Sequence, residues 1–185
     1  MCNLYSVTKG QEAIVAITRA MLDKTGNMPT FPGIFPDYSA PIVRNHEGPR
    51  ELAMARWGMP SPAFALKGRN SDPGITNVRN VKSPHRRRWL GVEGRWPSLP
   101  ASGRRNGSQC ERSKGETIND LFAFLTPEPN KEGGAIHPRA MPVIQTTSDE
   151  IESWMTAPAE EALKHQRPLP DGTLQILARG SKKDG

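Results

Sequence analysis

Cysteine is scarce in this chain, and so are aromatic residues and long apolar runs. Only Cys2 and Cys110 are present among 185 residues, too few for a disulfide framework, and no Cys/His cluster has the spacing of a zinc site. No apolar run approaches the roughly 18 residues of a membrane helix, and the first residues lack the basic and apolar regions of a signal peptide. We therefore expect a cytoplasmic protein that uses no metal, no cofactor and no membrane partner.

Glycine and proline are abundant by contrast, with 17 and 18 copies. Their combined share is well above the usual level of about 12% but below that of disordered chains. A chain of 185 residues has room for one domain with a hydrophobic core. We expect a single loop-rich domain over residues 1–180 and a polar tail over 181–185.

The formal net charge of +6 is concentrated in one segment. Residues 86–114 contain eight Lys and Arg against two Glu, so the rest of the chain is close to neutral. A pI near 9.6 generally favours nucleic-acid binding. Here the excess charge overlaps residues 94–117, a stretch with almost no apolar residues and no helical or strand periodicity. The charge alone is therefore weak support for a nucleic-acid partner.

Hydrophobic periodicity predicts three helices outside this atypical segment. Residues 9–26 carry apolar side chains at helical spacing and end on a glycine. A second helix is expected over 147–157, where Thr147 and Glu150 have the arrangement of a capping box, and a short third one over 159–166.

Short strands are expected between these helices. The candidate ranges are 41–44, 51–59, 74–81, 121–125, 141–145 and 173–179. Alternation along 74–81 predicts that Asn77 and Arg79 point to the same side of their strand. Strands interspersed with helices and joined by long loops indicate an α+β domain around a mixed or largely antiparallel sheet.

Cys2 has the most distinctive chemistry of any residue in the chain. If Met1 is removed, Cys2 carries an α-amine and a thiol on adjacent carbons, and both are partly nucleophilic near neutral pH. An aldehyde can condense with the amine to an imine, and the thiol can then close on the imine carbon to form a thiazolidine ring. In the alternative interpretation, Cys2 is a small apolar residue packed against the first strand.

Other polar and aromatic candidates each have a functional and a structural interpretation. His137 is expected between a Gly-Gly turn at 133–134 and a strand, at a loop-to-strand junction suited to proton transfer, or is a surface residue. Arg79 and Arg139 can hold phosphates or be solvated charges. Asn77 can bind a ligand or cap a turn. Trp57 can stack on a base or pack in the core.

Several short motifs follow one another along the chain. They are an initial Met-Cys, RELAMARWGM (50–59), the N-x-R strand at 77–79, and HPRAMPVI (137–144) followed by a WMTAP helix end (154–158). This combination resembles the SOS-response-associated peptidase family, whose members are also called abasic-site processing proteins. The match runs through most of residues 1–93 and 121–180.

The resemblance implies a barrel-like α+β domain that acts as a monomer in the DNA-damage response of the bacterial cytosol, near the nucleoid. Such a protein loses Met1, by autocatalysis or through an aminopeptidase, and exposes Cys2. The cysteine then traps abasic sites in single-stranded DNA as a thiazolidine crosslink. This peptidase and lyase chemistry agrees with the aminothiol chemistry expected of Cys2 itself.

The resemblance also implies roles for individual residues. Cys2 would be the nucleophile, Asn77 would orient the amino terminus or the sugar, and His137 would assist opening of the sugar ring and proton transfer. Arg79 and Arg139 would hold the phosphates that flank the lesion. Such contacts hold a strand without selecting its sequence.

Two further residues, Trp57 and Pro41, fall in motifs that line the DNA groove in the family. The resemblance therefore implies that their side chains contact the bound strand.

The chain departs from the family pattern in two places. Asn3 and Leu4 stand where the family more often has Gly-Arg, and no glutamate can be assigned to the catalytic position that the family places between the N-x-R strand and the histidine. Residues 94–117 occupy that place, either because of a frameshift joined to a deletion or as a genuine basic loop that contacts DNA. Three alternatives follow: a crosslinking enzyme with impaired chemistry, a non-catalytic single-strand binder, or an inactive remnant.

Overall fold

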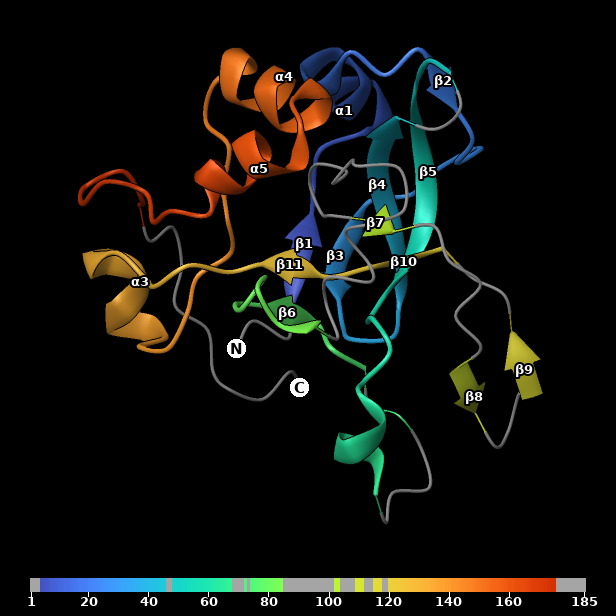
Figure 1. Ribbon diagram of the computed structural model, residues 1–185. Coiled ribbons are helices and arrows are strands. Elements are labelled where there is room, and N and C mark those ends of the chain that lie inside the picture. Colours follow the sequence, from blue (N-terminus) through green and yellow to red (C-terminus); the bar gives the residue numbers. More distant parts are fainter. Residues whose placement is uncertain are drawn as a thin grey trace.

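The computed structural model of this chain describes the following residues: 4–45, 48–67, 72, 74–84, 102–103, 109–111, 115–117 and 120–175. The first elements, shown in Figure 1, are β1 (Tyr5–Val7), α1 (Gln11–Thr18), β2 (Leu22–Asp23), β3 (Phe31–Ile34), β4 (Ser39–Asn45), β5 (Arg50–Trp57), the 3-10 helix η1 (Ala63–Leu66) and β6 (Asn77–Val78). The remaining elements are β7 (Ser102–Gly103), β8 (Gln109–Glu111), β9 (Gly115–Thr117), β10 (Leu121–Phe122), β11 (Phe124–Leu125), α3 (Lys131–Ile136), α4 (Ser148–Thr156), α5 (Ala159–Ala162) and η2 (Leu163–His165).

The strand β5 is the centre of the largest sheet. One edge of β5 pairs with β4 as an antiparallel hairpin over its whole length. The other edge is shared, because β2 pairs in parallel with Glu51 and Leu52 while β10 pairs in parallel with Arg56 and Trp57. β7 adds an antiparallel strand beyond β10. Since both edges of β5 are occupied, most of its side chains are buried.

Three smaller sheets complete the strand arrangement. β1 pairs with β3 antiparallel, β11 pairs with β6 in parallel, and β8 pairs with β9 antiparallel. The mixed α+β class expected from the sequence is confirmed. Within the described part of the chain, however, the strands form four separate sheets, none of which closes on itself.

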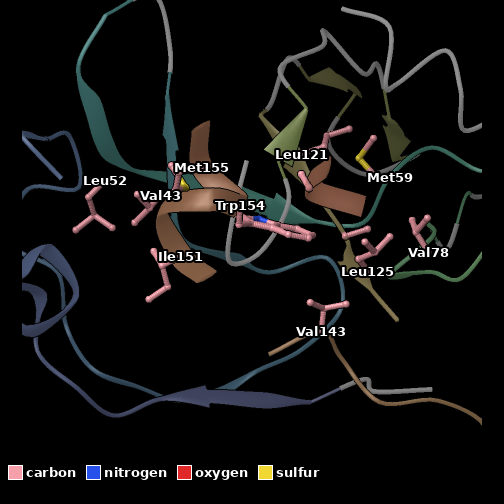
Figure 2. Close-up of a cluster of buried hydrophobic side chains, with 12 residues drawn as sticks. Val43, Leu52, Met59, Val78, Leu121, Leu125, Val143, Ile151, Trp154 and Met155 are labelled. Atoms are coloured by element: carbon pink, nitrogen blue, oxygen red, sulfur yellow. The ribbon is translucent and has the colours of Figure 1, made fainter. Parts of the chain in front are cut away.

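The core consists of two clusters of buried side chains. In the first cluster, Trp154 of α4 lies between Val43 and Leu52 on one side and Leu125 and Val78 on the other (Figure 2). α1, α4 and α5 gather at the top of the view in Figure 1. The second cluster is aromatic and aliphatic and lies on the β4–β5 hairpin, with these members: Ile34, Ala40, Ile42, Ala53, Ala55, Trp57 and Phe122.

The first helix is shorter than its apolar pattern predicts. α1 ends at Thr18, and Arg19 adopts the left-handed conformation with φ 54°. Beyond it the backbone turns to β5, because Met21 N donates to Arg50 O at 2.7 Å and Lys24 N donates to Leu52 O at 2.8 Å. These strand contacts satisfy backbone groups that a longer helix would have satisfied internally. The expectation of a helix as far as residue 26 is therefore wrong.

The later helices agree with the sequence more closely. α4 begins after the predicted cap, with Thr147 Oγ1 accepting from Glu150 N at 3.2 Å, and ends before Pro158. The Glu150 carboxylate accepts from Thr146 N and Oγ1 at 2.8 and 3.0 Å, and a backbone hydrogen bond from Thr147, as in the predicted capping box, helps to hold its pKa below the ordinary value. The short helix expected over 159–166 is present as α5 and η2.

Most of the predicted strands are present, but their lengths differ. β4 and β5 confirm the strands expected over 41–44 and 51–59, and the range 121–125 contains β10 and β11 with a break at Ala123. Only Asn77 and Val78 of the range 74–81 form a strand.

Three of the other sequence predictions had different outcomes. Residues 141–145 form no strand, although Val143 N donates to Leu125 O at 2.8 Å. Residues 94–117 were expected to lack regular structure, yet they contain β7, β8 and β9. Residues 173–175 are not in a strand, and the rest of the range 173–179 lies outside the described residues.

Candidate functional site

The candidate nucleophile Cys2 lies outside the described residues, which begin at Leu4. The chain enters the described structure through β1, whose Tyr5 pairs with Ile34 of β3. Tyr5 is therefore the landmark that locates the amino-terminal segment relative to the other candidate residues.

Tyr5 packs into a group of four aromatic rings. Its ring makes edge contacts with Trp57 at 5.1 Å and with Phe124 at 5.0 Å between centroids. Trp57 in turn stacks on Phe122 at 6.3 Å. Burial of the Tyr5 hydroxyl raises its pKa well above the ordinary value, because the phenolate would lose its hydration there. The phenol is therefore protonated near neutral pH.

Asn77 borders this aromatic group. In the parallel ladder between β6 and β11, Asn77 is the register partner of Phe124, one of the two rings that contact Tyr5. The Asn77 side chain is buried, with 8% of the residue exposed, and its Nδ2 donates to Thr76 Oγ1 at 2.8 Å. Trp57, the other ring that contacts Tyr5, also borders Asn77, because its Nε1 donates to the carbonyl oxygen of the preceding residue, Thr76, at 3.0 Å. β1, β6 and β11 meet near the centre of Figure 1.

Arg79 and Arg139 come together from distant parts of the sequence. Arg79 Nη1 donates to Arg139 O at 3.0 Å, and Arg79 Nη2 forms an ion pair with Glu128 Oε1 at 2.7 Å. The Arg79 backbone is held by Gln166, whose Nε2 donates to Arg79 O at 2.7 Å and to Thr126 O at 3.1 Å. Both the Arg79 and the Glu128 side chains are exposed, so the guanidinium is accessible to an anion.

The predicted common face of Asn77 and Arg79 is not present as a strand surface. β6 ends at Val78, so Arg79 lies beyond the ladder and is exposed while Asn77 is buried.

His137 lies at the end of a helix rather than after a Gly-Gly turn. Gly133 and Gly134 belong to α3, and Asn130 caps the start of this helix by accepting from Gly133 N at 2.9 Å. His137 ends the helix, with its N–H donating to Gly133 O at 2.8 Å, and its side chain is half-buried. Two residues after His137 the chain reaches Arg139, whose carbonyl oxygen accepts from Arg79.

Two candidates for DNA contact belong to the core instead. Trp57 is 0% exposed and lies among the aromatic rings, and Pro41 is buried in the middle of β4 opposite Met54. A base cannot stack on a ring that has no accessible face. We therefore place Trp57 and Pro41 in the core, which for Trp57 is the alternative that the sequence left open.

Some residues of this region were not predicted from the sequence. Tyr5, Thr76 and Glu128 owe their place to contacts with residues far away along the chain, such as the 49-residue separation of Arg79 and Glu128. The only signal in the sequence was the position of Glu128 in the Pro-rich TPEPN loop just before α3.

The described residues contain no group of three or more His, Cys, Asp or Glu side chains that could hold a metal ion. None of the helices in this part of the chain has the length and apolar character needed to cross a membrane.

Comparison with known proteins supports the fold and leaves the family open. No protein-family profile and no curated protein matches the chain. Two crystal structures from the Northeast Structural Genomics Consortium are similar to it. A protein of Bordetella bronchiseptica shares 18% identity with a TM-score of 0.58, covering 92% of this chain and 95% of its own. A protein of Bacteroides thetaiotaomicron shares 16% identity with a TM-score of 0.55, covering 90% and 87%. At these identities the likeness shows a shared fold.

Proposed function

We propose that this protein traps abasic sites in single-stranded DNA through a thiazolidine crosslink to Cys2, as its resemblance to the abasic-site processing proteins implies. The observation that carries the proposal is that Asn77, which borders the aromatic rings on Tyr5, is followed two residues later by Arg79, whose Nη1 donates to Arg139 O. Asn77 and Arg139 lie 62 positions apart in the sequence.

The short connection to Tyr5 limits how far Cys2 can lie from this group of residues. Three peptide units separate Cys2 from Tyr5, so their Cα atoms can be at most about 11 Å apart. Tyr5 itself contacts Phe124, the register partner of Asn77. An amino-terminal cysteine tethered at Tyr5 can therefore meet a sugar bound beside Asn77.

The chemistry needs only the aminothiol and an aldehyde. In the ring-opened abasic sugar, the α-amine of Cys2 attacks the aldehyde carbon, and the aldehyde oxygen leaves as water to give an imine. The thiol then adds to the imine carbon, and its proton passes to the nitrogen. One C–N and one C–S bond form, and one water is lost. In this scheme His137 moves protons during opening of the sugar ring, and Asn77 orients the amine or the sugar.

Arg79 and Arg139 supply the binding energy for the backbone in this proposal. Guanidinium groups hold phosphates through charge-assisted hydrogen bonds, and such contacts are independent of base sequence. The proposed partner is accordingly single-stranded DNA of any sequence that contains an abasic site, and the proposed species is a monomer in the bacterial cytosol.

The family's catalytic glutamate has no counterpart that we can assign in this chain. Loss of a general acid or base typically slows a reaction by about 10²- to 10⁴-fold. We therefore expect slow imine formation or slow reversal of the crosslink rather than complete loss of trapping.

The test is a crosslinking assay with single-stranded DNA that carries one abasic site. The purified protein should give a product that survives heat and salt on a denaturing gel. Cys2→Ala should abolish this product, while Cys110→Ala, which removes the other cysteine, should leave it intact. If both variants form the product, the attachment is not through the amino-terminal thiol and the proposal is wrong.

A non-catalytic single-strand binder is the second candidate, favoured by the same Arg79–Arg139 contact. It predicts reversible binding that weakens steeply with salt, as counterions compete for the phosphates. Cys2→Ala would then bind DNA as well as the unaltered protein, and neither would form a covalent product.

A further inference from the structure

Gln166 joins two segments of the chain through its side-chain amide. It lies at the end of the 3-10 helix η2, where its backbone N–H donates to Leu163 O at 3.0 Å. Its Nε2 donates to Arg79 O at 2.7 Å and to Thr126 O at 3.1 Å. A primary amide nitrogen carries two hydrogens, so this single group can satisfy both carbonyls.

The two carbonyls lie where the parallel ladder between β6 and β11 ends. β6 ends at Val78 and β11 at Leu125, and the last ladder contact is the bond from Thr126 N to Val78 O at 2.9 Å. Arg79 and Thr126 are the residues that directly follow the two strands. The Gln166 amide therefore continues the connection between the two segments where their strand pairing stops.

The helices before Gln166 hold its backbone in a fixed place. Ala162 of α5 is buried in the first core cluster, and Leu163 packs against the same cluster. On the other side, Arg167 forms an ion pair with Glu150 of α4. Gln166 is thus held from both directions along the chain, and its amide reaches the two strand ends from a core-anchored support.

The two segments that Gln166 joins both lead to the charged groups around Arg79. Glu128, two residues after Thr126, pairs with Arg79 Nη2 at 2.7 Å, and Arg79 Nη1 donates to Arg139 O at 3.0 Å. The Arg79 side chain is exposed, so few contacts restrain it. The point at which the Arg79 backbone is held therefore strongly influences where its guanidinium lies.

We propose that Gln166 is a positioning residue for Arg79: its amide fixes the Arg79 backbone so that the guanidinium is presented to a DNA phosphate beside the Arg139 segment. The inference rests on the phosphate-binding role of Arg79 in the proposed function and adds a residue that acts through Arg79. A guanidinium that is already held in place loses less conformational freedom when it binds, so preorganisation strengthens binding without a new contact.

The test measures binding of a single-stranded oligonucleotide without an abasic site, by fluorescence anisotropy. Gln166→Met keeps an unbranched side chain of similar length but has no N–H donor. Its affinity should fall by about two- to tenfold, the effect of a lost neutral hydrogen bond. The slope of log affinity against log salt should become shallower by up to about 0.7, the value for one phosphate contact with a single strand.

A double-mutant cycle shows whether Gln166 acts through Arg79. Arg79→Ala should lower the affinity at least as much as Gln166→Met does. Adding Gln166→Met to Arg79→Ala should then cause no further loss, because the side chain that Gln166 positions is already absent.

Asn45→Ala is the matched control for a purely structural role. Asn45, on β4, makes a similar amide bond from its Nδ2 to Met155 O at 2.7 Å and is not assigned to the site. Both Asn45→Ala and Gln166→Met should lower the thermal midpoint. Only Gln166→Met should weaken DNA binding at a temperature at which all variants are folded.

The outcomes separate this inference from the proposed function. The role of Gln166 is overturned by an unchanged affinity of Gln166→Met or of Arg79→Ala, by an equal loss with and without the Arg79 side chain, or by an equal loss in Asn45→Ala. The proposed function is decided by crosslinking to Cys2, which none of these measurements uses. A loss in Gln166→Met that requires Arg79 would support the inference even if the unaltered protein forms no crosslink.

Discussion

The charge of the Arg79 side chain is already paired with a carboxylate, that of Glu128. Its ion pair with Glu128 joins two exposed side chains, and such surface pairs contribute only about 0–1 kcal/mol. In the proposed complex, a DNA phosphate would displace the Glu128 carboxylate from Arg79 at small cost. Glu128 would then compete with the phosphate and add a repulsive negative charge next to the bound strand.

Glu128→Gln should consequently strengthen binding of single-stranded DNA. We expect an increase in affinity of a few fold at low salt, which becomes smaller as salt screens the charges. Fluorescence anisotropy with a labelled oligonucleotide measures this directly. Glu161→Gln removes a comparable surface carboxylate that pairs with Lys164, and it should have little effect. Equal effects of the two substitutions would indicate that only net charge matters and that Glu128 does not compete for Arg79.

The contacts around the candidate residues were harder to predict from the sequence than the candidates themselves. Arg79 and Arg139 were selected as phosphate ligands, and the structure brings them into contact. Glu128 could not be predicted as the partner of Arg79, since nothing local connects residues 49 positions apart. Trp57 is the opposite case, because an isolated tryptophan looks the same in the sequence whether it faces a base or the core.

At the scale of elements, α3 illustrates how a cap can override unfavourable composition. Two adjacent glycines in a six-residue helix weaken it, because glycine loses more backbone entropy than other residues on folding. The sequence therefore predicted a turn at Gly133 and Gly134. The Asn130 side chain stabilises the first turn instead, and Lys131 N donates to Asp171 Oδ1 at 2.9 Å. The contact with Asp171, 40 residues away, is not visible in the local pattern.

The two glycines of α3 should respond differently to alanine. A Cβ on Gly134 would meet only Pro129 at 3.7 Å, an ordinary contact, so Gly134→Ala should stabilise the protein by about 0.5–1 kcal/mol. A Cβ on Gly133 would lie 3.0 Å from the capping Oδ1 of Asn130. Gly133→Ala should gain less stability than Gly134→Ala or lose some. Urea unfolding of both variants checks this, and a larger gain for Gly133→Ala would contradict the described cap.

The length of α1 shows a second limit of local patterns. Apolar residues continue at helical spacing past its end, yet Met21 is exposed and its N–H pairs with β5. The helix stops where the backbone begins to pair with the edge of β5, and hydrophobic periodicity carries no information about that pairing.

For the molecule as a whole, a buried charge network ties the main sheet together. Arg44 of β4 and Glu51 of β5 are cross-strand partners joined at 2.6 Å. Lys24, just after β2, reaches Glu51 at 2.5 Å, and Asp120, just before β10, accepts from Arg44 at 2.7 Å. Glu51 is 1% exposed, so its charge depends on these partners. The network therefore connects four strands of the sheet.

Glu51→Gln should strongly destabilise the protein. Removing one partner of a buried ion pair typically costs about 3–5 kcal/mol, because the remaining charge is buried without full compensation. Glu152→Gln is the control, because its carboxylate is partly exposed in the pair with Arg50 and should contribute about 1 kcal/mol or less. Chemical denaturation of both variants measures the difference. Similar free energies of unfolding for the two would contradict the network.

The same carboxylate makes stability depend on pH. Burial by itself would raise the pKa of Glu51, but hydrogen bonds from Lys24 and Arg44 outweigh it and hold the pKa below the ordinary value. The stabilisation from Glu51 is then fully present above the unfolded-state pKa of about 4.3 and is lost as pH falls through the folded-state value. The difference in unfolding free energy between the unaltered protein and Glu51→Gln should narrow accordingly below about pH 4.

Sequence patterns predicted the fold class and the two strands of the central hairpin well, and the arrangement of the sheets poorly. The hairpin strands β4 and β5 are adjacent in the sequence, so local alternation was sufficient. The parallel pairing of β5 with β2 and β10 joins distant segments of only two residues each. Such short strands have no periodicity of their own, and tertiary contacts alone define them.

The proposed crosslink is tested most directly by the mass of the product formed with abasic single-stranded DNA, measured without a reducing agent. The proposed chemistry predicts a species equal to the protein without Met1 plus the DNA, less one water, with the DNA attached to the tryptic peptide over residues 2–9. Attachment to another residue, a product that forms only after borohydride reduction, or no covalent product would contradict it.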